Sequence, residues 1–128
     1  MVDLTQRDPA RSRDRDRIAF GAFLRMADLW SLSTDQQITL LGSPARSTFF
    51  KWKKEGGILP VDTLERISHL LSIHKCLTIL FPDPDRADSW VHHENRYWHG
   101  QSAMDLMQSG RMADIILVRR YLDAQRGG

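Results

Sequence analysis

The stretch from residue 42 to residue 54 constrains the fold of this chain more than any other segment. It contains four basic residues and no acidic one, and Phe49 and Trp52 stand three positions apart, so both fall on one helical face. Just upstream, residues 34–41 have the pattern of a short helix, which Gly42 closes. A short helix, a glycine turn and a basic helix form the layout of a DNA-reading helix-turn-helix. A helical hairpin with a solvated basic face is the alternative.

The side chains in and after this turn are of the kinds that contact DNA. An arginine can donate two hydrogen bonds to a guanine edge, hydroxyl groups can donate to phosphates or bases, and lysines can hold phosphates. The recognition helix is predicted over residues 44–54, with Pro44 in its first turn, where a missing N–H costs nothing. The predicted DNA-binding residues are Ser43, Arg46, Ser47, Thr48, Lys51, Lys53 and Lys54.

Composition limits the class of protein. A chain of 128 residues with 41% hydrophobic residues can form one or two small domains with a real core. The net charge of +2 is too small for a general nucleic-acid binder, so the positive charge must act locally. Cys76 is the only cysteine, which excludes an internal disulfide, and its apolar helical surroundings predict a small buried side chain. No signal peptide or bilayer-length apolar run is evident, so a cytoplasmic location is expected.

Helical periodicity throughout and the lack of strand-period segments predict an all-α fold. Residues 1–14 alternate Arg and Asp and are expected to form a mobile arm. A helix then starts at residue 15 or 16, with an apolar stripe of Ile18, Ala22, Phe23, Met26 and Trp30. Ser33 or Thr34 can cap the next helix. A long helix is predicted over residues 61–80.

Residues 81–85 contain two prolines and two aspartates, which cannot continue a helix, so they mark the one internal boundary. After it we expect a short helix from residue 88, a loop, a helix capped by Ser102, and an amphipathic helix over residues 111–124. This last unit has too few residues for a core of its own, so it should pack on the N-terminal helices, a second copy or a partner. The predicted units are an arm (1–14), a helix-turn-helix domain (15–81) and a helical C-terminal unit (82–128).

Three histidines and a glutamate gather between residues 92 and 99. Their spacing matches no zinc signature, and the interleaved aromatic residues favour packing or an interface. The sequence also has no glycine-rich phosphate loop and no Ser-His-Asp pattern, so neither catalytic residues nor cofactor nor metal are expected. A metal-dependent enzyme built on His92, His93, Glu94 and His99 is kept as an alternative.

Two sets of motifs resemble a known family. The residues from Leu40 to Trp52 are similar to an Xre-type helix-turn-helix. The chain from residue 15 to residue 128 resembles antitoxins of the Xre/MbcA/ParS type, the partners of RES-domain toxins. It departs from the pattern at His99, where the family usually has glycine, and at Ala103, where it often has proline. The motifs that resemble the family's toxin-binding domain are residues 81–83, 87–90, 95, 100–102, 105–107, 109–110 and 118–124.

The resemblance implies a non-enzymatic antitoxin. Its C-terminal region would block the active-site cleft of an NAD-consuming RES toxin, and its N-terminal domain would bind operator DNA and repress its own operon. It would form a homodimer within a larger toxin–antitoxin assembly. A free basic tail with Arg119, Arg120 and Arg126 would suit a cleft built for a dinucleotide. The alternative is a stand-alone helix-turn-helix transcription regulator with a C-terminal dimerisation or ligand-binding unit. The predicted toxin-binding residues are Trp98, Gly100, Ser102, Met104, Met107, Arg111, Arg119, Arg120, Tyr121 and Arg126.

Overall fold

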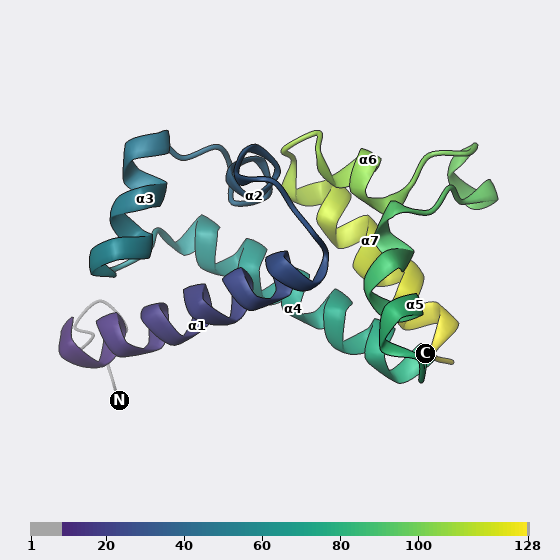
Figure 1. Cartoon of the computed structure of the whole chain (residues 1–128), viewed down its shortest axis with the longest axis horizontal. Coiled ribbons are helices and arrows are strands. Elements are labelled where there is room, and N and C mark those ends of the chain that lie inside the picture. Colours follow the sequence, from purple (N-terminus) through teal and green to yellow (C-terminus); the bar gives the residue numbers. More distant parts are fainter. Residues whose placement is uncertain (1–8, 128) are drawn as a thin grey trace, which may run out of the picture.

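The computed structural model describes residues 9–127, and within that range the chain consists of α-helices joined by turns and short 3₁₀ helices (Figure 1). The predicted all-α class is confirmed, because no strand occurs in this part of the chain. The nearest approach to a strand is one isolated β-bridge between Glu94 and Ser102. No helix among these residues has the length and apolar character needed to cross a membrane.

The N-terminal half contains α1 (Pro9–Leu29), α2 (Thr34–Leu40), α3 (Arg46–Glu55) and α4 (Val61–Leu80). The prediction for α4 is confirmed at both ends. So is the predicted capping of α2, since the Ser33 hydroxyl accepts from the Gln36 N–H and the Gln36 side chain accepts from the Ser33 N–H. This reciprocal pair satisfies two N–H groups that a helix start leaves free.

The structure corrects the start of the first helix. Residues 9–14 were expected in an arm but are helical, while residues 1–8 lie outside the described residues. Pro9 suits the first helical position, and the Asp16 carboxylate accepts a hydrogen bond from the Leu59 N–H at 2.8 Å, which ties the early turns to the chain. The predicted apolar stripe is wrong at Ile18, which is 67% exposed.

The turn between α2 and α3 depends on Gly42. Its φ is +93°, and a Cβ there would lie 3.0 Å from both Arg66 Nε and Asp62 Oδ2, so a side chain meets strain and a clash. The turn is also longer at its C-terminal end than the sequence predicted. Ala45 is still extended (ψ 142°) and precedes the first helical residue, so α3 begins at Arg46 instead of Pro44.

The C-terminal half contains α5 (Pro84–Ser89), η2 (Trp90–His92), η3 (Arg96–Trp98), α6 (Ala103–Met107) and α7 (Met112–Gln125). The helix expected from residue 88 begins at Pro84, inside the predicted break. Proline is favoured in the first turn of a helix, and the Asp83 side chain caps this one by accepting from the Asp85 N–H. The predicted cap of α6 by Ser102 is confirmed.

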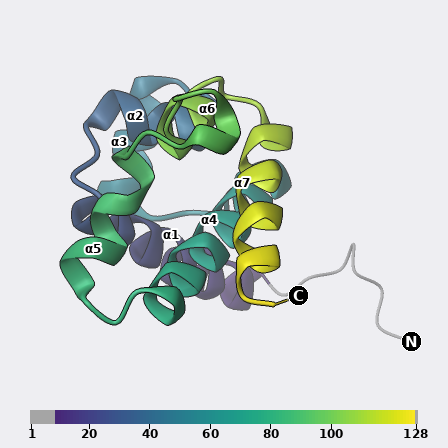
Figure 2. The same cartoon turned by 90° about the vertical axis from the view of Figure 1, so that its right-hand side faces the viewer.

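Helix α4 is the centre of the molecule. It packs on α1 along one side and on α5 and α7 along others, and Figure 2 shows α5 and α7 flanking its C-terminal half. One continuous core runs through these helices and includes fully buried Phe23, Trp30, Phe49, Leu70 and Ile115. The C-terminal unit therefore packs on the N-terminal helices, which is one of the three alternatives that the sequence left open. Cys76 is buried, as predicted.

Candidate functional site

One face of α3 is fixed against the core. Phe49 and Trp52 are buried, and the ring of Phe20 meets both edge-on, with centroid distances of 5.8 and 6.0 Å. Edge-to-face aromatic pairs of this kind set the rotation of a helix about its axis. The opposite face of α3 therefore turns to solvent. Its exposed side chains are Arg46, Ser47, Phe50, Lys51 and Lys54.

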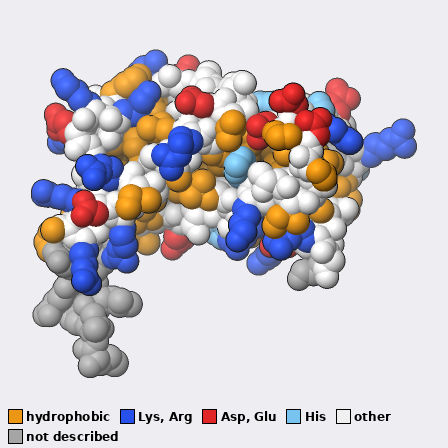
Figure 3. All heavy atoms as spheres, turned by 60° about the horizontal axis from the view of Figure 1, so that its bottom comes forward, with side chains coloured by type: hydrophobic (Ala, Val, Ile, Leu, Met, Phe, Trp, Pro, Cys, Tyr) orange, Lys and Arg blue, Asp and Glu red, His pale blue; other side chains and the backbone are white. Residues whose placement is uncertain are grey.

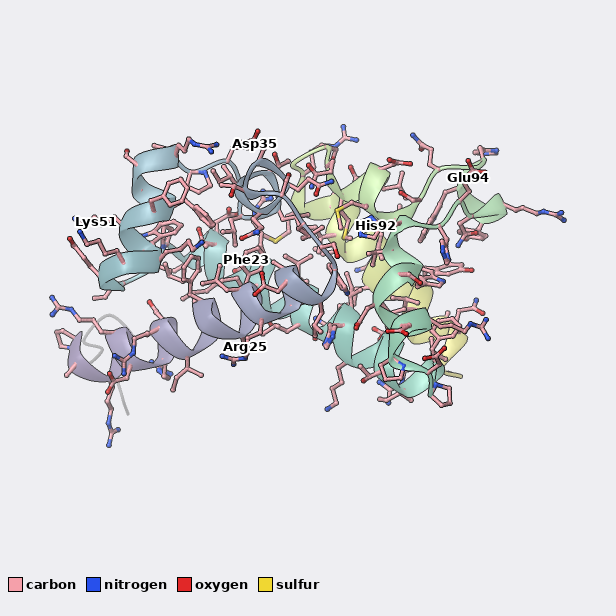
Figure 4. All side chains as sticks on the ribbon, viewed as in Figure 1. Phe23, Arg25, Asp35, Lys51, His92 and Glu94 are labelled. Atoms are coloured by element: carbon pink, nitrogen blue, oxygen red, sulfur yellow. The ribbon has the colours of Figure 1, made fainter. Side chains whose placement is uncertain are left out.

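Arg46 is held in place by two elements. Its Nη1 donates to Asp35 Oδ1 of α2 at 2.6 Å, and its guanidinium carbon lies 5.5 Å from the centroid of the Phe50 ring. Figure 4 shows Lys51 projecting outward from α3 and Asp35 on α2. The residue that sequence reasoning missed is Phe50. Its signal was its place in the chain, four positions after Arg46 and four before Lys54.

The other predicted DNA-binding residues lie around this face. Ser43 is exposed in the turn with a φ of 60°. Lys53 stands at the edge of the face, with its Nζ 5.8 Å from the centroids of Phe49 and Phe50. Thr48 is half-buried on the flank of α3, where it lines a shallow hollow with residues of the turn. DNA contact by these residues stays a prediction.

The basic surface extends beyond α3. Lys and Arg side chains gather at the end of the molecule where α1 begins and α3 lies (Figure 3). Arg13 and Arg17 of α1 are exposed, and the Arg17 Cδ is 3.9 Å from where a Cβ of Gly56 would lie, at the end of α3. Arg13 lies within the segment predicted as a mobile arm but is helical in the structure.

A groove lies on the other half of the molecule, between η3 and α7. Its volume is about 640 Å³. Tyr97 on one wall is 71% exposed and Leu117 on the other is 42% exposed, so both offer apolar surface to solvent. The groove has one charged lining residue among those described, Arg120. The lining residues are Tyr97, Trp98, Ala113, Ile116, Leu117, Arg120, Tyr121, Ala124 and Gln125.

A cluster of aromatic rings forms and backs one wall of this groove. The Tyr121 ring centroid is 4.8 Å from that of Trp98, 5.1 Å from that of Tyr97 and 6.2 Å from that of Trp90. These rings join α7 to the loop that carries η2 and η3. Of the packing and interface alternatives for the aromatic residues among the histidines, Trp98 packs within the chain, whereas Tyr97 is 71% exposed. The wall is rigid because each ring is held by several others.

The structure divides the predicted toxin-binding residues into two groups. Trp98, Ser102, Met104 and Met107 are buried, with Ser102 occupied as the cap of α6. Side chains buried within the chain have little surface for a partner. Of these four residues, only Trp98 lines the groove. Gly100 is exposed on the adjoining loop.

The predicted arginines occupy different surroundings. Arg120 lines the groove, whereas Arg111 forms an ion pair with Asp114 at 3.0 Å on α7. Arg119 Nη1 lies 2.9 Å from Nδ1 of His69 on α4. The expected free tail is corrected: α7 continues to Gln125 and carries Arg119 and Arg120, and only Arg126 follows it.

The contact between α4 and α7 perturbs a histidine. Burial and the neighbouring guanidinium of Arg119 lower the pKa of His69, while Glu65 acts weakly in the opposite direction. A neutral His69 can accept the Arg119 hydrogen bond through Nδ1. This pair therefore joins the two halves of the molecule in its neutral-histidine form.

Two further hydrogen bonds connect the turn between α6 and α7 to the N-terminal helices. Gln108 Nε2 donates to the Gln36 carbonyl of α2 at 3.2 Å. Arg66 Nη1 donates to the Gly110 carbonyl at 2.8 Å, while its Nε donates to Asp62 at the same distance. The surface of α3 and the groove on α7 thus belong to one packed body.

The histidine-rich segment has a structural contact. His92 Nε2 is 2.6 Å from the Trp30 carbonyl oxygen at the end of α1, while His93, Glu94 and His99 are exposed. His92 and Glu94 lie well apart in Figure 4. Within residues 9–127 no three His, Cys, Asp or Glu side chains are placed to hold a metal ion. The metal-dependent enzyme therefore has no ligand set in this part of the chain.

Comparisons with known proteins agree with this division into two functional regions. A family model described as the antitoxin Xre-like helix-turn-helix domain matches residues 9–72. A second, described as the antitoxin Xre/MbcA/ParS C-terminal toxin-binding domain, matches residues 76–128. An uncharacterized protein of Sinorhizobium fredii (strain NBRC 101917 / NGR234), y4oB, is 63% identical over 107 residues, which cover 84% of this chain and 83% of that protein.

The two matches meet within α4, which packs on α1 of the first region and on α7, one wall of the groove, in the second. Both describe parts of an antitoxin, and neither describes an enzyme. The chain belongs to the Xre/MbcA/ParS family of antitoxins, with a helix-turn-helix domain followed by a toxin-binding domain.

Proposed function

We propose that this antitoxin neutralises a RES-domain toxin that consumes NAD, by placing its C-terminal region over the toxin's active-site cleft. We also propose that its helix-turn-helix represses its own operon. The RES assignment rests on the resemblance of the C-terminal motifs to the partners of such toxins. The observation that carries the proposal is the apolar groove between η3 and α7, because it lies inside the region matched by the toxin-binding domain.

The groove has the composition of a protein-binding site. Tyrosine and arginine dominate the energetics of protein interfaces, and here Tyr97, Tyr121 and Arg120 line one hollow beside the exposed Leu117. We assign direct toxin contact to these four residues. The buried Trp98, Ser102, Met104 and Met107 then hold the groove in shape from beneath.

Arginine also suits the chemistry of the proposed target. Carboxylate side chains in or around the toxin's cleft would match the planar guanidinium, which pairs with a carboxylate through two hydrogen bonds. Arg120 is exposed in the groove, and Arg126 is exposed just beyond the end of α7. We propose that Arg120 pairs with acidic side chains of the toxin's cleft.

The test is co-expression with the adjacent reading frame, followed by affinity pull-down and measurement of the dissociation constant. Arg120→Ala should weaken the complex by about 30-fold if the arginine is a central contact. The matched control is Arg25→Ala, an exposed arginine that projects from α1 away from α7 (Figure 4). Point variants are preferable to deletion of residues 119–128, because that deletion removes Leu122, which is 1% exposed.

Repression of the operon requires DNA binding through α3. A homodimer would place two copies of α3 on half-sites about 34 Å apart along the duplex. Because lysines that neutralise phosphates release counterions, affinity for the operon's upstream DNA should fall steeply between about 50 and 200 mM salt. Fluorescence anisotropy measures this, and sedimentation gives the oligomeric state. DNA binding without any toxin complex would favour the stand-alone regulator.

A further inference from the structure

We propose that Arg46 and Phe50 together read a thymine–guanine step in the major groove. Arg46 donates to the guanine edge, and the Phe50 ring contacts the 5-methyl group of the neighbouring thymine. This inference rests on the proposed function, in which α3 is the recognition helix, and it names the base pairs that the helix selects.

The position of Phe50 carries the first part of the inference. Phe49 next to it is buried, whereas Phe50 is 42% exposed in the middle of the outward face of α3, among Arg46, Lys51 and Lys54. A phenyl ring cannot bind phosphate. In the major groove, the apolar group that base pairs present is the thymine methyl, and phenylalanine is among the side chains that contact it. The Phe50 ring therefore selects a base, whereas its charged neighbours on this face can bind phosphates.

The surroundings of Arg46 carry the second part. Asp35 accepts from its Nη1 at 2.6 Å, and the Phe50 ring lies under its guanidinium at 5.5 Å. An arginine has five N–H donors, so the contact with Asp35 leaves donors for a second acceptor pair. Guanine presents two acceptors, N7 and O6, in the arrangement that arginine matches. Asp35 is a positioning residue, because it fixes the guanidinium before DNA arrives.

The distance between the two groups indicates that they read neighbouring base pairs. Stacked base pairs are separated by about 3.4 Å along the helix axis, so two steps span about 6.8 Å. The 5.5 Å between the guanidinium carbon and the ring centroid is shorter than two steps and longer than one. Because the guanidinium lies over the Phe50 ring, the two groups stay close together, and adjacent bases fit them better than separated ones.

The experiment uses the full chain and a randomised duplex library, from which the bound sequences are recovered and sequenced. A thymine–guanine step should be enriched. In the best duplex, that thymine is then replaced by uracil, which pairs identically but lacks the methyl group. Binding by the wild type should weaken by about fourfold, the effect expected for one buried methyl group, and binding by Phe50→Ala should not respond to the replacement.

The guanine is tested in the same way. Replacing it with 7-deazaguanine removes the N7 acceptor and should weaken wild-type binding by about tenfold, with a much smaller effect on Arg46→Ala. Asp35→Asn should reduce the preference for guanine over adenine without reducing affinity for random duplex, a pattern that mere loss of folding does not produce. Arg25→Ala is the control, because Arg25 is exposed on α1 outside this face and its loss should keep both base preferences.

Two results would overturn this inference in distinguishable ways. If the wild type binds selected duplexes but responds to neither base replacement, or if Phe50→Ala responds to uracil as the wild type does, the base assignment is wrong while DNA binding stands. If the wild type binds no duplex at low salt, the proposed DNA-binding function fails together with it.

Discussion

Replacing Arg66 with alanine tests whether the two functional regions form one body. Arg66 is 8% exposed on α4 and donates to the Gly110 carbonyl at 2.8 Å and to Asp62 at 2.8 Å. The substitution leaves the Gly110 carbonyl without this donor and removes the buried stem of the side chain. A hydrogen bond from a charged group contributes about 1.5–3 kcal/mol. The ion pair with Asp62 is half-buried, and because solvent reaches the carboxylate it contributes about 1 kcal/mol.

We therefore expect Arg66→Ala to lower the free energy of unfolding by about 2–3 kcal/mol. The assay is urea denaturation followed by circular dichroism and by tryptophan fluorescence, which together report both halves of the molecule. The matched variant Asp62→Ala removes the half-buried ion pair but keeps the bond to Gly110, so it should cost less than Arg66→Ala, about 1 kcal/mol. If both variants cost the same, the bond to Gly110 contributes nothing and the reasoning about this link is refuted.

Three further predictions concern turns and pH. Gly42→Ala should lower the free energy of unfolding more than Gly57→Ala does. Both glycines have positive φ, but only at Gly42 do other atoms lie 3.0 Å from the added Cβ. Equal decreases in the free energy of unfolding would contradict the clash. His99→Gly should stabilise the protein by up to about 1 kcal/mol, since His99 has a φ of 55°, whereas Gly100→Ala (φ 87°) should destabilise it; a thermal melt decides both. Burial lowers the pKa of His69 in the folded protein, so the unfolded chain binds a proton at this residue more readily. The free energy of unfolding should therefore be highest above the usual histidine pKa of 6.5 and should fall as the pH drops below it. The free energy of unfolding should differ less between about pH 7.5 and pH 5.5 in His69→Gln than in the wild type. An equal difference in the two proteins would contradict the role of His69.

The sequence predicted those helices whose ends carry local signals. The long apolar periodicity of residues 61–80 lies between Pro60 and Pro82, so α4 was located at both ends. The start of α1 was missed because its first turns are rich in charge, and what ties them down is a contact between Asp16 and Leu59, far apart in the chain. Composition carries no information about such a contact.

The candidate sites divide in the same way. The basic face of α3 followed from helical spacing, because Phe49 and Trp52 had to face inward and their opposite side had to face out. On the C-terminal side, α6 has only five residues, too few for periodicity to define a face, so the burial of Met104 and Met107 was not predictable. The groove could not be predicted either, because η3 and α7 meet only through tertiary packing.

The structure shows the backbone conformation at the two positions that depart from the family pattern, His99 and Ala103. His99 stands where the family usually has glycine, and it adopts the left-handed conformation (φ 55°, ψ 38°) that glycine favours. Ala103 stands where proline is frequent, at the first residue of α6, the position that proline suits. Ser102 and Asp105 form a reciprocal cap at the start of α6 in this chain.

The central claim is that the groove between η3 and α7 binds and silences the toxin. The most direct measurement is the intracellular NAD concentration after induction of the adjacent reading frame, in cells that express the wild type, Leu117→Asp or Arg25→Ala. Leu117 is 42% exposed in the groove, so aspartate there should disrupt binding without disturbing the core. We predict that the wild type and Arg25→Ala preserve NAD and that Leu117→Asp, expressed at the same level, does not. Preservation of NAD by Leu117→Asp to the same degree would contradict the claim.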